Sequence, residues 1–142
     1  MSLVLTQEGA ARLWQWLLGL VPPAVANVHL LGMPYIPTHT STLSALAANE
    51  VTGDTGYSPR ALFHAAADWT ISGLPTGAQA QYITVSWTLV SAPAVYGYYV
   101  SDDAFTVSLW AEQFASPWTN PGPPGVMALQ LPPTLTSLPS TS

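Results

Sequence analysis

Apolar and polar side chains alternate most regularly over residues 82–89. Ile83, Val85, Trp87 and Leu89 fall on one side, and residues that carry hydroxyl groups fall on the other. A period of two is typical of a β-strand with one buried face. The sequence therefore predicts a strand over residues 82–89.

Two further apolar runs predict a β-hairpin over residues 94–114. The first run is aromatic and β-branched, the second alternates from Phe105 onward, and residues 101–104 supply the turn. Gly97 lies in the middle of the first arm, where glycine weakens a strand. We expect a bulge at Gly97, or a neighbouring backbone or ring that lies close over it.

Shorter elements complete the predicted fold. Apolar residues in helical spacing after hydroxyl caps predict a helix of about two turns over residues 42–49. Gly, Pro and Asp turn signals separate short strands, and Pro59 marks one of them as an edge strand. These strands are expected at residues 27–31, 57–65, 69–72 and 126–131, with loops at 32–41 and 116–125.

One amphipathic helix is predicted at residues 6–18, with Thr6 as its N-cap and Gly19 and Pro22-Pro23 beyond its end. Trp16 lies off the apolar stripe of this helix. The stripe either packs on the β-structure or forms a docking surface with Trp16 as an exposed anchor. The stripe consists of Ala10, Leu13, Trp14, Leu17 and Leu18.

Together these elements predict a mostly-β chain: an antiparallel β-sandwich, jelly-roll-like, with one N-terminal amphipathic helix and an extended C-terminal arm. Residues 1–26 hold the helix and a proline linker, residues 27–131 the β-sandwich, and residues 132–142 the arm. The proline-rich composition of the arm suits a segment that lies along a neighbouring molecule.

Charge changes the picture because there is so little of it. The chain has two cationic residues, Arg12 and Arg60, and seven acids, for a net charge of −5. A nucleic-acid partner is excluded, since phosphate neutralisation requires a basic surface. A membrane partner is not expected either, because Pro22-Pro23 interrupts the apolar residues 13–33. Only 6% of the residues are charged. The protein is therefore either a monomer whose surface is covered with Thr and Ser, or one whose surface is partly covered by a partner or by copies of the chain.

No catalytic or metal-binding pattern emerges. Cysteine is absent, and the three histidines are too dispersed for a metal cluster. Nothing in the sequence pairs the carboxylates of Glu50, Asp68 and Glu112 across a cleft. The turn acids Asp102-Asp103 either accept backbone N–H groups or, with Asp54, bind a hard cation. We therefore predict no enzyme activity and no cofactor. The tryptophans Trp69, Trp110 and Trp118 either belong to the core or stack on sugars.

Several short motifs occur in order along the chain: Asn49-Glu50, Gly56-Tyr57 with Arg60, Tyr96-Gly97-Tyr98, Leu109 to Phe114, and Leu131 to Ser137. Together they resemble a group of small structural proteins of tailed-bacteriophage virions, over roughly residues 45 to 137. Two features depart from that group: Ser58-Pro59 lengthens the spacing between Gly-Tyr and Arg, and the proline-rich residues 120–125 replace a Gly-Asp.

The resemblance implies a non-enzymatic capsid decoration, or cement, protein on the capsid surface of a virion that assembles in the host cytoplasm. Its partners would be the major capsid protein and itself, as a dimer or trimer. The alternative is a head-fibre or tail adhesion module that binds host glycan. The residues expected at the interface are Trp14, Trp16, Leu17, Trp118, Pro132, Pro133 and Leu135.

Overall fold

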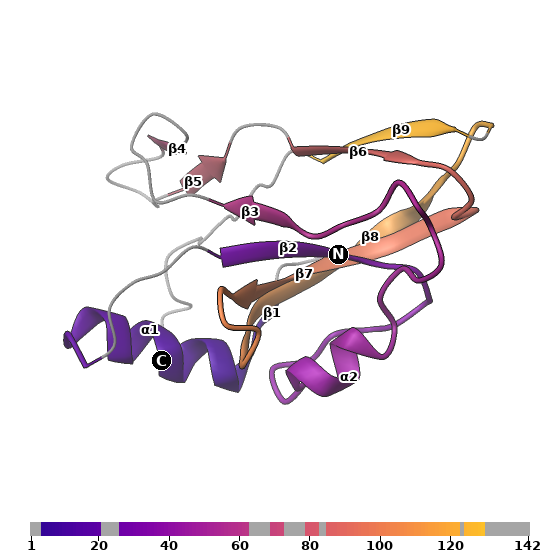
Figure 1. The fold of residues 1–142 in the computed structure, drawn as a ribbon. Helices are drawn as coiled ribbons and strands as arrows, with labels where there is room; N and C mark the ends of the chain where they lie inside the picture. Colours follow the sequence, from indigo (N-terminus) through magenta and orange to yellow (C-terminus); the bar gives the residue numbers. More distant parts are fainter. Residues whose placement is uncertain are drawn as a thin grey trace.

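The structure, a computed structural model, describes residues 4–20, 26–62, 69–72, 79–82, 85–122 and 124–129. Its largest element is a five-stranded antiparallel sheet with the strand order β1-β8-β7-β2-β3 (Figure 1). The central strand β7 pairs on one side with β8, which follows it directly in the chain, and on the other side with β2 from the N-terminal part of the chain. The strands are β1 (Val4–Leu5), β2 (Ala26–Leu31), β3 (Arg60–Leu62), β7 (Ala94–Asp102) and β8 (Ser108–Thr119).

The predicted hairpin is confirmed as the pair β7–β8, and Gly97 has both features expected of it. The strand register shifts between Val95 and Gly97, and a Cβ atom at Gly97 would lie 2.3 Å from the carbonyl oxygen of Glu112. The boundaries of β8 differ from the prediction. It begins at Ser108 rather than Phe105, and it continues to Thr119 through residues expected to form a loop. Phe105 instead belongs to the turn, with a positive φ of 55°.

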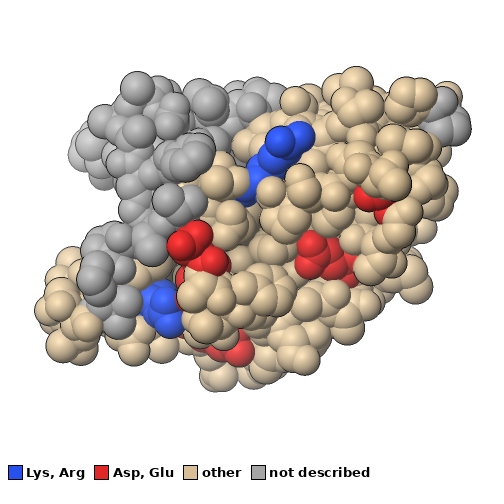
Figure 2. All heavy atoms as spheres, viewed as in Figure 1, with Lys and Arg blue, Asp and Glu red and all other residues tan. Residues whose placement is uncertain are grey.

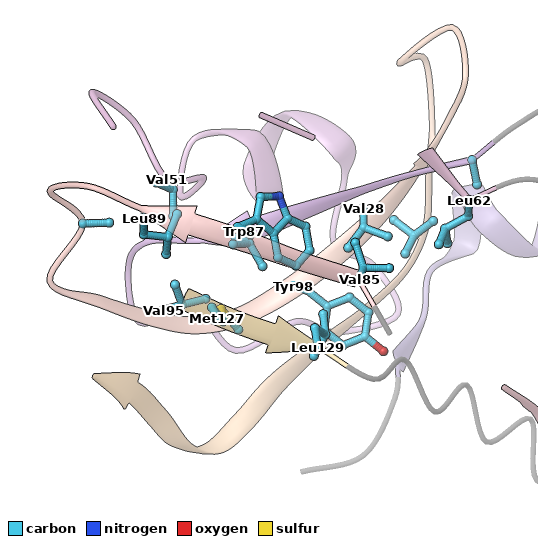
Figure 3. Packing of buried hydrophobic residues seen from close by; sticks show 14 of the residues in the cluster. Val28, Val51, Leu62, Val85, Trp87, Leu89, Val95, Tyr98, Met127 and Leu129 are labelled. Carbon is cyan, nitrogen blue, oxygen red and sulfur yellow. The ribbon is translucent and has the colours of Figure 1, made fainter. Parts of the chain in front are cut away.

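A second ladder pairs β6 (Val85–Leu89) with β9 (Gly125–Leu129) and lies over one face of the main sheet (Figure 1). Val85, Trp87 and Leu89 all point into the core, as the alternation predicts. Their ring and methyl groups pack against Val28 and Tyr98 of the main sheet (Figure 3). The space between the β6–β9 ladder and the main sheet therefore contains the larger apolar cluster, which we call the main core.

Residues 82–89 do not behave as the single strand that the alternation predicts. Tyr82 ends β5 (Gln79–Tyr82), which pairs with β4 (Trp69–Ser72), whereas β6 begins at Val85 and pairs with β9. A periodic pattern identifies extended backbone but does not specify the strand partner. The bounds of β4 match its prediction.

Helices lie on the opposite side of the main sheet from β6 and β9 (Figure 1). Helix α1 spans Gln7–Leu17 with Thr6 as N-cap, and α2 spans Leu43–Ala47 with Thr42 as N-cap. Both caps are the predicted ones. Leu43 and Leu46 of α2 form a second apolar cluster with Leu31, Tyr99 and Ala111 of the sheet.

A mostly-β chain with antiparallel sheets and one N-terminal helix is thus confirmed. The predicted arm at 132–142 lies outside the described residues. In the part of the chain that the structure describes, no helix has the length and apolar character needed to span a lipid bilayer.

Candidate docking surface

The first turn of α1 is held tightly against strand β8. The Thr6 hydroxyl donates to the Ser108 carbonyl at 2.7 Å and accepts from the Gly9 N–H at 2.9 Å. Gly9 approaches the strand so closely that a Cβ atom there would lie 1.9 Å from the Leu109 carbonyl oxygen. Glycine at this position therefore sets the distance between the helix and the sheet.

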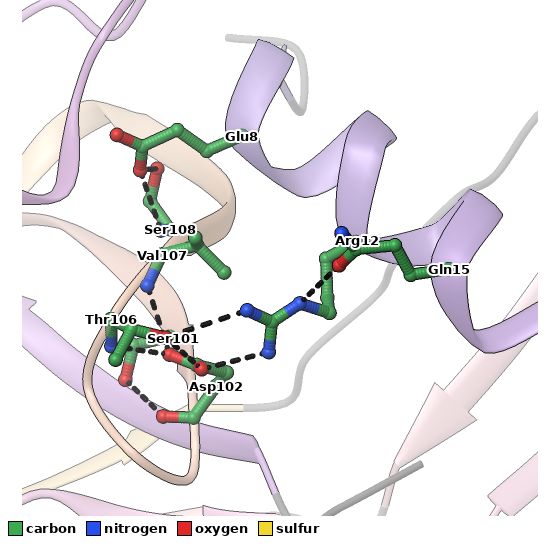
Figure 4. Close-up of polar contacts among 8 residues, drawn as sticks. All are labelled: Glu8, Arg12, Gln15, Ser101, Asp102, Thr106, Val107 and Ser108. Atoms are coloured by element: carbon green, nitrogen blue, oxygen red, sulfur yellow. Dashed lines mark hydrogen bonds and ion pairs between the residues drawn. The ribbon is translucent and has the colours of Figure 1, made fainter. Parts of the chain in front are cut away.

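Charged groups continue this contact along the helix (Figure 4). Arg12 donates from Nη1 to Oδ2 of the buried Asp102 at 2.9 Å. One oxygen of Glu8 accepts from the backbone N–H groups of Ser108 at 2.9 Å and Leu43 at 3.1 Å. These contacts fix the orientation of α1 about its own axis, because they join it to β8, to the hairpin turn and to α2.

The residues that face the sheet are consequently Gly9, Arg12 and Trp16, at positions i, i+3 and i+7 of the helix. Trp16 is half-buried and packs against the main core. The predicted apolar stripe points elsewhere: Leu13 is 37% exposed, Trp14 61%, Leu17 75% and Leu18 63%. The expectation that this stripe packs on the sheet is wrong, and so is the expectation that Trp16 is an exposed anchor.

The exposed stripe borders a shallow apolar groove beside β1. Its volume is about 310 Å³. On the face of the molecule seen in Figure 2, charged atoms form small separate groups among uncharged residues. An exposed apolar groove on a rigidly held helix is a surface suited to binding another protein. The groove is lined by Leu5, Ala10, Leu13, Trp14 and Leu17.

The predicted interface residues divide into separate groups. Trp14 and Leu17 lie together in the α1 groove, whereas Trp118 is half-buried against the main core. Trp110 is also partly buried against that core, and the side chain of Trp69 lies outside the described part of the structure. The predicted residues Pro132, Pro133 and Leu135 lie outside the described part of the chain.

A cluster of polar side chains under α2 is the second site with unusual chemistry. Glu50 accepts from the hydroxyls of Tyr57 at 2.6 Å and Tyr99 at 2.5 Å, and its Oε2 lies 3.1 Å from Nδ1 of His29. The opposite ring nitrogen of His29 lies 2.8 Å from the Ser101 hydroxyl. The His29 ring also stacks on Tyr99, with ring centroids 4.5 Å apart.

These contacts place Ser101, His29 and Glu50 in the order of the serine, histidine and acid of a catalytic triad. The Ser101 side chain, however, lies within the central strand and is 0% exposed. A nucleophile must reach the carbonyl carbon that it attacks. In this structure the Ser101 side chain is inaccessible to solvent, and the hydrogen bonds of the group join β2 and β7 to the segment that carries Glu50 and Tyr57.

The acids expected as an alternative cation site already have other partners. Asp102 already faces Arg12 and accepts the backbone N–H groups of Thr106 and Val107. Asp54 is engaged separately, with the backbone N–H groups of Gly56, Val90, Ser91 and Ala92. Among the residues that the structure describes, no three potential metal-ligating side chains gather at one place.

These contacts alter the acidity of three carboxyl groups. Burial alone raises each pKa, but hydrogen bonds to the charged form outweigh burial and lower the pKa of Glu50, Asp54 and Asp102. Backbone N–H groups lower the pKa of Asp54 to about 2. For Glu50 the donors are His29, Tyr57 and Tyr99.

We expect acid to destabilise the fold through these groups. Because each pKa is lower in the folded state than its ordinary value of 3.8 or 4.5, the stability they contribute is complete above that value and lost as pH falls through the folded-state pKa. Urea midpoints measured from about pH 6 to about pH 2 should therefore decrease below about pH 4.5. An Asp54→Asn variant should show a smaller decrease. A flat profile for the natural sequence would contradict the assignment.

Sequence reasoning missed two features of these sites. In the sequence, Glu50 stands as an unpaired carboxylate and as part of the motif Asn49-Glu50, and nothing there pairs it with Tyr57 or Tyr99. The residues that face the sheet, Gly9, Arg12 and Trp16, also have helical spacing. They do not form an apolar stripe, because only one of the three is a large apolar residue.

No protein-family model, curated protein or solved structure matches this chain.

Proposed function

We propose that this protein is a capsid decoration protein of a tailed bacteriophage, which attaches to the coat lattice through the exposed apolar face of α1. The observation that carries the proposal is the outward orientation of Leu13, Trp14 and Leu17 on a helix held by buried contacts. The motif resemblance supplies the class of partner, the major capsid protein.

The way α1 is held supports binding as its role. A helix already fixed at Thr6, Gly9 and Arg12 loses little conformational entropy when a partner covers its outer face. Trp14 and the leucines beside it supply the large apolar side chains that dominate binding energy. Attachment of several linked copies to one shell would allow each contact to be weak.

The finer fold assignment belongs to the same proposal. The β6–β9 ladder packs over the main sheet with a shared core, which supports a small β-sandwich of the jelly-roll type. Residues 132–142 would be its extended arm. The low charge of the chain, 6% of its residues, supports assembly as a homo-oligomer whose copies cover part of the surface.

A double substitution on α1 tests the proposal. Leu13→Ser with Leu17→Ser should weaken binding to purified capsids by about a hundredfold, because two large apolar anchors are lost. The unfolding free energy should change by no more than about 1 kcal/mol, since both side chains are exposed. Binding is measured by co-sedimentation with capsids stripped of the chain.

Val126→Ser is the matched control, because Val126 is an equally exposed apolar residue on β9. It should bind as the natural sequence does. Equal saturation of capsids by the α1 double variant would refute docking through this face. Quantitative mass spectrometry of virions provides the wider test: hundreds of copies per particle support decoration, and absence from particles rejects it.

A further inference from the structure

An irregularity in the hairpin borders a second groove, which lies further along β8 than the residues Ser108 and Leu109 that contact α1. Between the pairs Gly97–Gln113 and Val95–Trp118, β7 contributes one residue and β8 contributes four. The extra residues of β8 bend away from the ladder opposite Tyr96, as bulges do. The groove they border has a volume of about 440 Å³. It is lined by Pro34, Tyr96, Gln113, Phe114, Ala115 and Pro117.

The lining of this groove has the chemistry of a site for proline-rich peptides. Such sites offer aromatic rings to the pyrrolidine rings of a polyproline helix and a few polar groups to its free carbonyls. Tyr96 and Phe114 supply the rings here, and Gln113 supplies an amide. The centroid of the Phe114 ring lies 6.2 Å from that of the buried Tyr98 ring. This contact holds the Phe114 ring in place beside the groove.

The chain itself contains a matching ligand. Residues 130–142 include Pro132, Pro133 and Pro139, three leucines and no charged residue. The groove residues carry no charge either. An uncharged peptide can therefore enter without leaving an ionised group unpaired.

The direction of β9 bears on whether residues 130–142 fill the groove of their own molecule or that of a second copy. Gly125 pairs with Leu89, and Asn120 bonds to the carbonyls of Leu89 and Ala92, so this end of the ladder lies beside the groove. The strand β9 then runs away from it and ends at Leu129, opposite Val85. The described part of this strand therefore ends at the end of the ladder that lies away from its own groove. We take the groove of a second copy as the one that residues 130–142 fill, and the cross-linking described below distinguishes the two cases.

We propose that residues 130–142 of one copy bind in the Tyr96–Phe114 groove of a neighbouring copy. The contact is head-to-tail, since it joins two different surfaces, and head-to-tail contacts close into rings such as trimers or extend into chains. This inference concerns a site separate from the α1 face and holds whether or not α1 binds a capsid.

Sedimentation of the full chain tests the proposal, with a synthetic peptide of residues 130–142 as the competitor. The full chain should self-associate, and excess peptide should dissociate it. A peptide with Pro132→Ala and Pro133→Ala should compete about tenfold less well, because it loses the rings that fill the groove. Ala115→Trp, which fills the groove from an exposed position, should weaken self-association at least as much.

Several results would overturn the proposal. The first is a full chain that stays monomeric at all concentrations. The second is self-association that neither the peptide nor Ala115→Trp changes. The third is a set of cross-links from residue 135 to residue 114 that form only within one molecule. Tyr96→Ala provides a second variant, with circular dichroism to show that it folds, and Val126→Ala is the control at an exposed apolar site. The α1 double variant should lose capsid binding and keep self-association, so failure of either proposal is recognised separately.

Discussion

Replacing Asp102 with alanine should lower the free energy of unfolding by about 3–5 kcal/mol, the range found when one partner of a buried ion pair is removed. Asp102 is 2% exposed. Its carboxylate accepts from Thr106 N at 2.6 Å, from Val107 N at 3.0 Å and from Arg12 Nη1 at 2.9 Å. It also accepts from the Thr106 hydroxyl. Alanine would leave the guanidinium and two backbone donors without their acceptor.

Two further substitutions separate the contributions to this loss. Asp102→Asn keeps an oxygen for the turn amides and loses the charge opposite Arg12, so we expect about half the effect of alanine. Arg12→Met removes the charge from α1 and keeps much of the apolar length of the side chain. Urea denaturation measures all three variants at neutral pH. A loss below about 1 kcal/mol for Asp102→Ala would show that the ion pair does not secure α1 to the hairpin.

Replacing Trp87 with alanine should also cost about 3–5 kcal/mol, because the cavity left by a buried indole collapses only in part. Trp87 is 1% exposed at the centre of the core between β6–β9 and the main sheet (Figure 3). Its Nε1 donates to the Ser58 carbonyl at 2.8 Å. Loss of the ring therefore removes apolar contacts and leaves a carbonyl without its donor.

Trp14→Ala is the matched control, since it deletes the same side chain from a position that is 61% exposed. We expect it to change the unfolding free energy by at most about 0.5 kcal/mol. Trp87→Phe should fall between the two and remains measurable if the alanine variant does not fold. Similar losses for Trp14→Ala and Trp87→Ala would contradict the assignment of the α1 face as a free surface.

Local patterns predicted most of the elements in this protein. The alternation at Val85, Trp87 and Leu89 predicted which residues are buried in β6, and Thr6 and Thr42 predicted where both helices begin. Gly97 predicted a bulge or a close neighbour, and the structure has both a register shift and a close backbone contact there. Each of these properties depends on backbone conformation or hydrogen bonding within a few residues, so a single sequence contains the information.

The exposed face of α1 could be identified only from the tertiary structure. Both possible faces of α1 have helical spacing, and the sequence left open whether the apolar stripe packs on the sheet or faces outward. The choice was made by Arg12, whose partner Asp102 is 90 residues away, and by Gly9, whose contact is with the backbone of β8. No local rule specifies a partner at that separation.

The difference between local and long-range contacts also explains which other features could be predicted from the sequence. By itself, the sequence determined the helix caps, the buried positions of β6 and the low content of charged residues. Only the tertiary structure decided which tryptophans are buried, that Glu50 gathers His29, Tyr57 and Tyr99, and that four residues of β8 bulge opposite Tyr96 to border a groove. These depend on strand pairing and register, which are set by contacts summed over the whole chain rather than by any one segment.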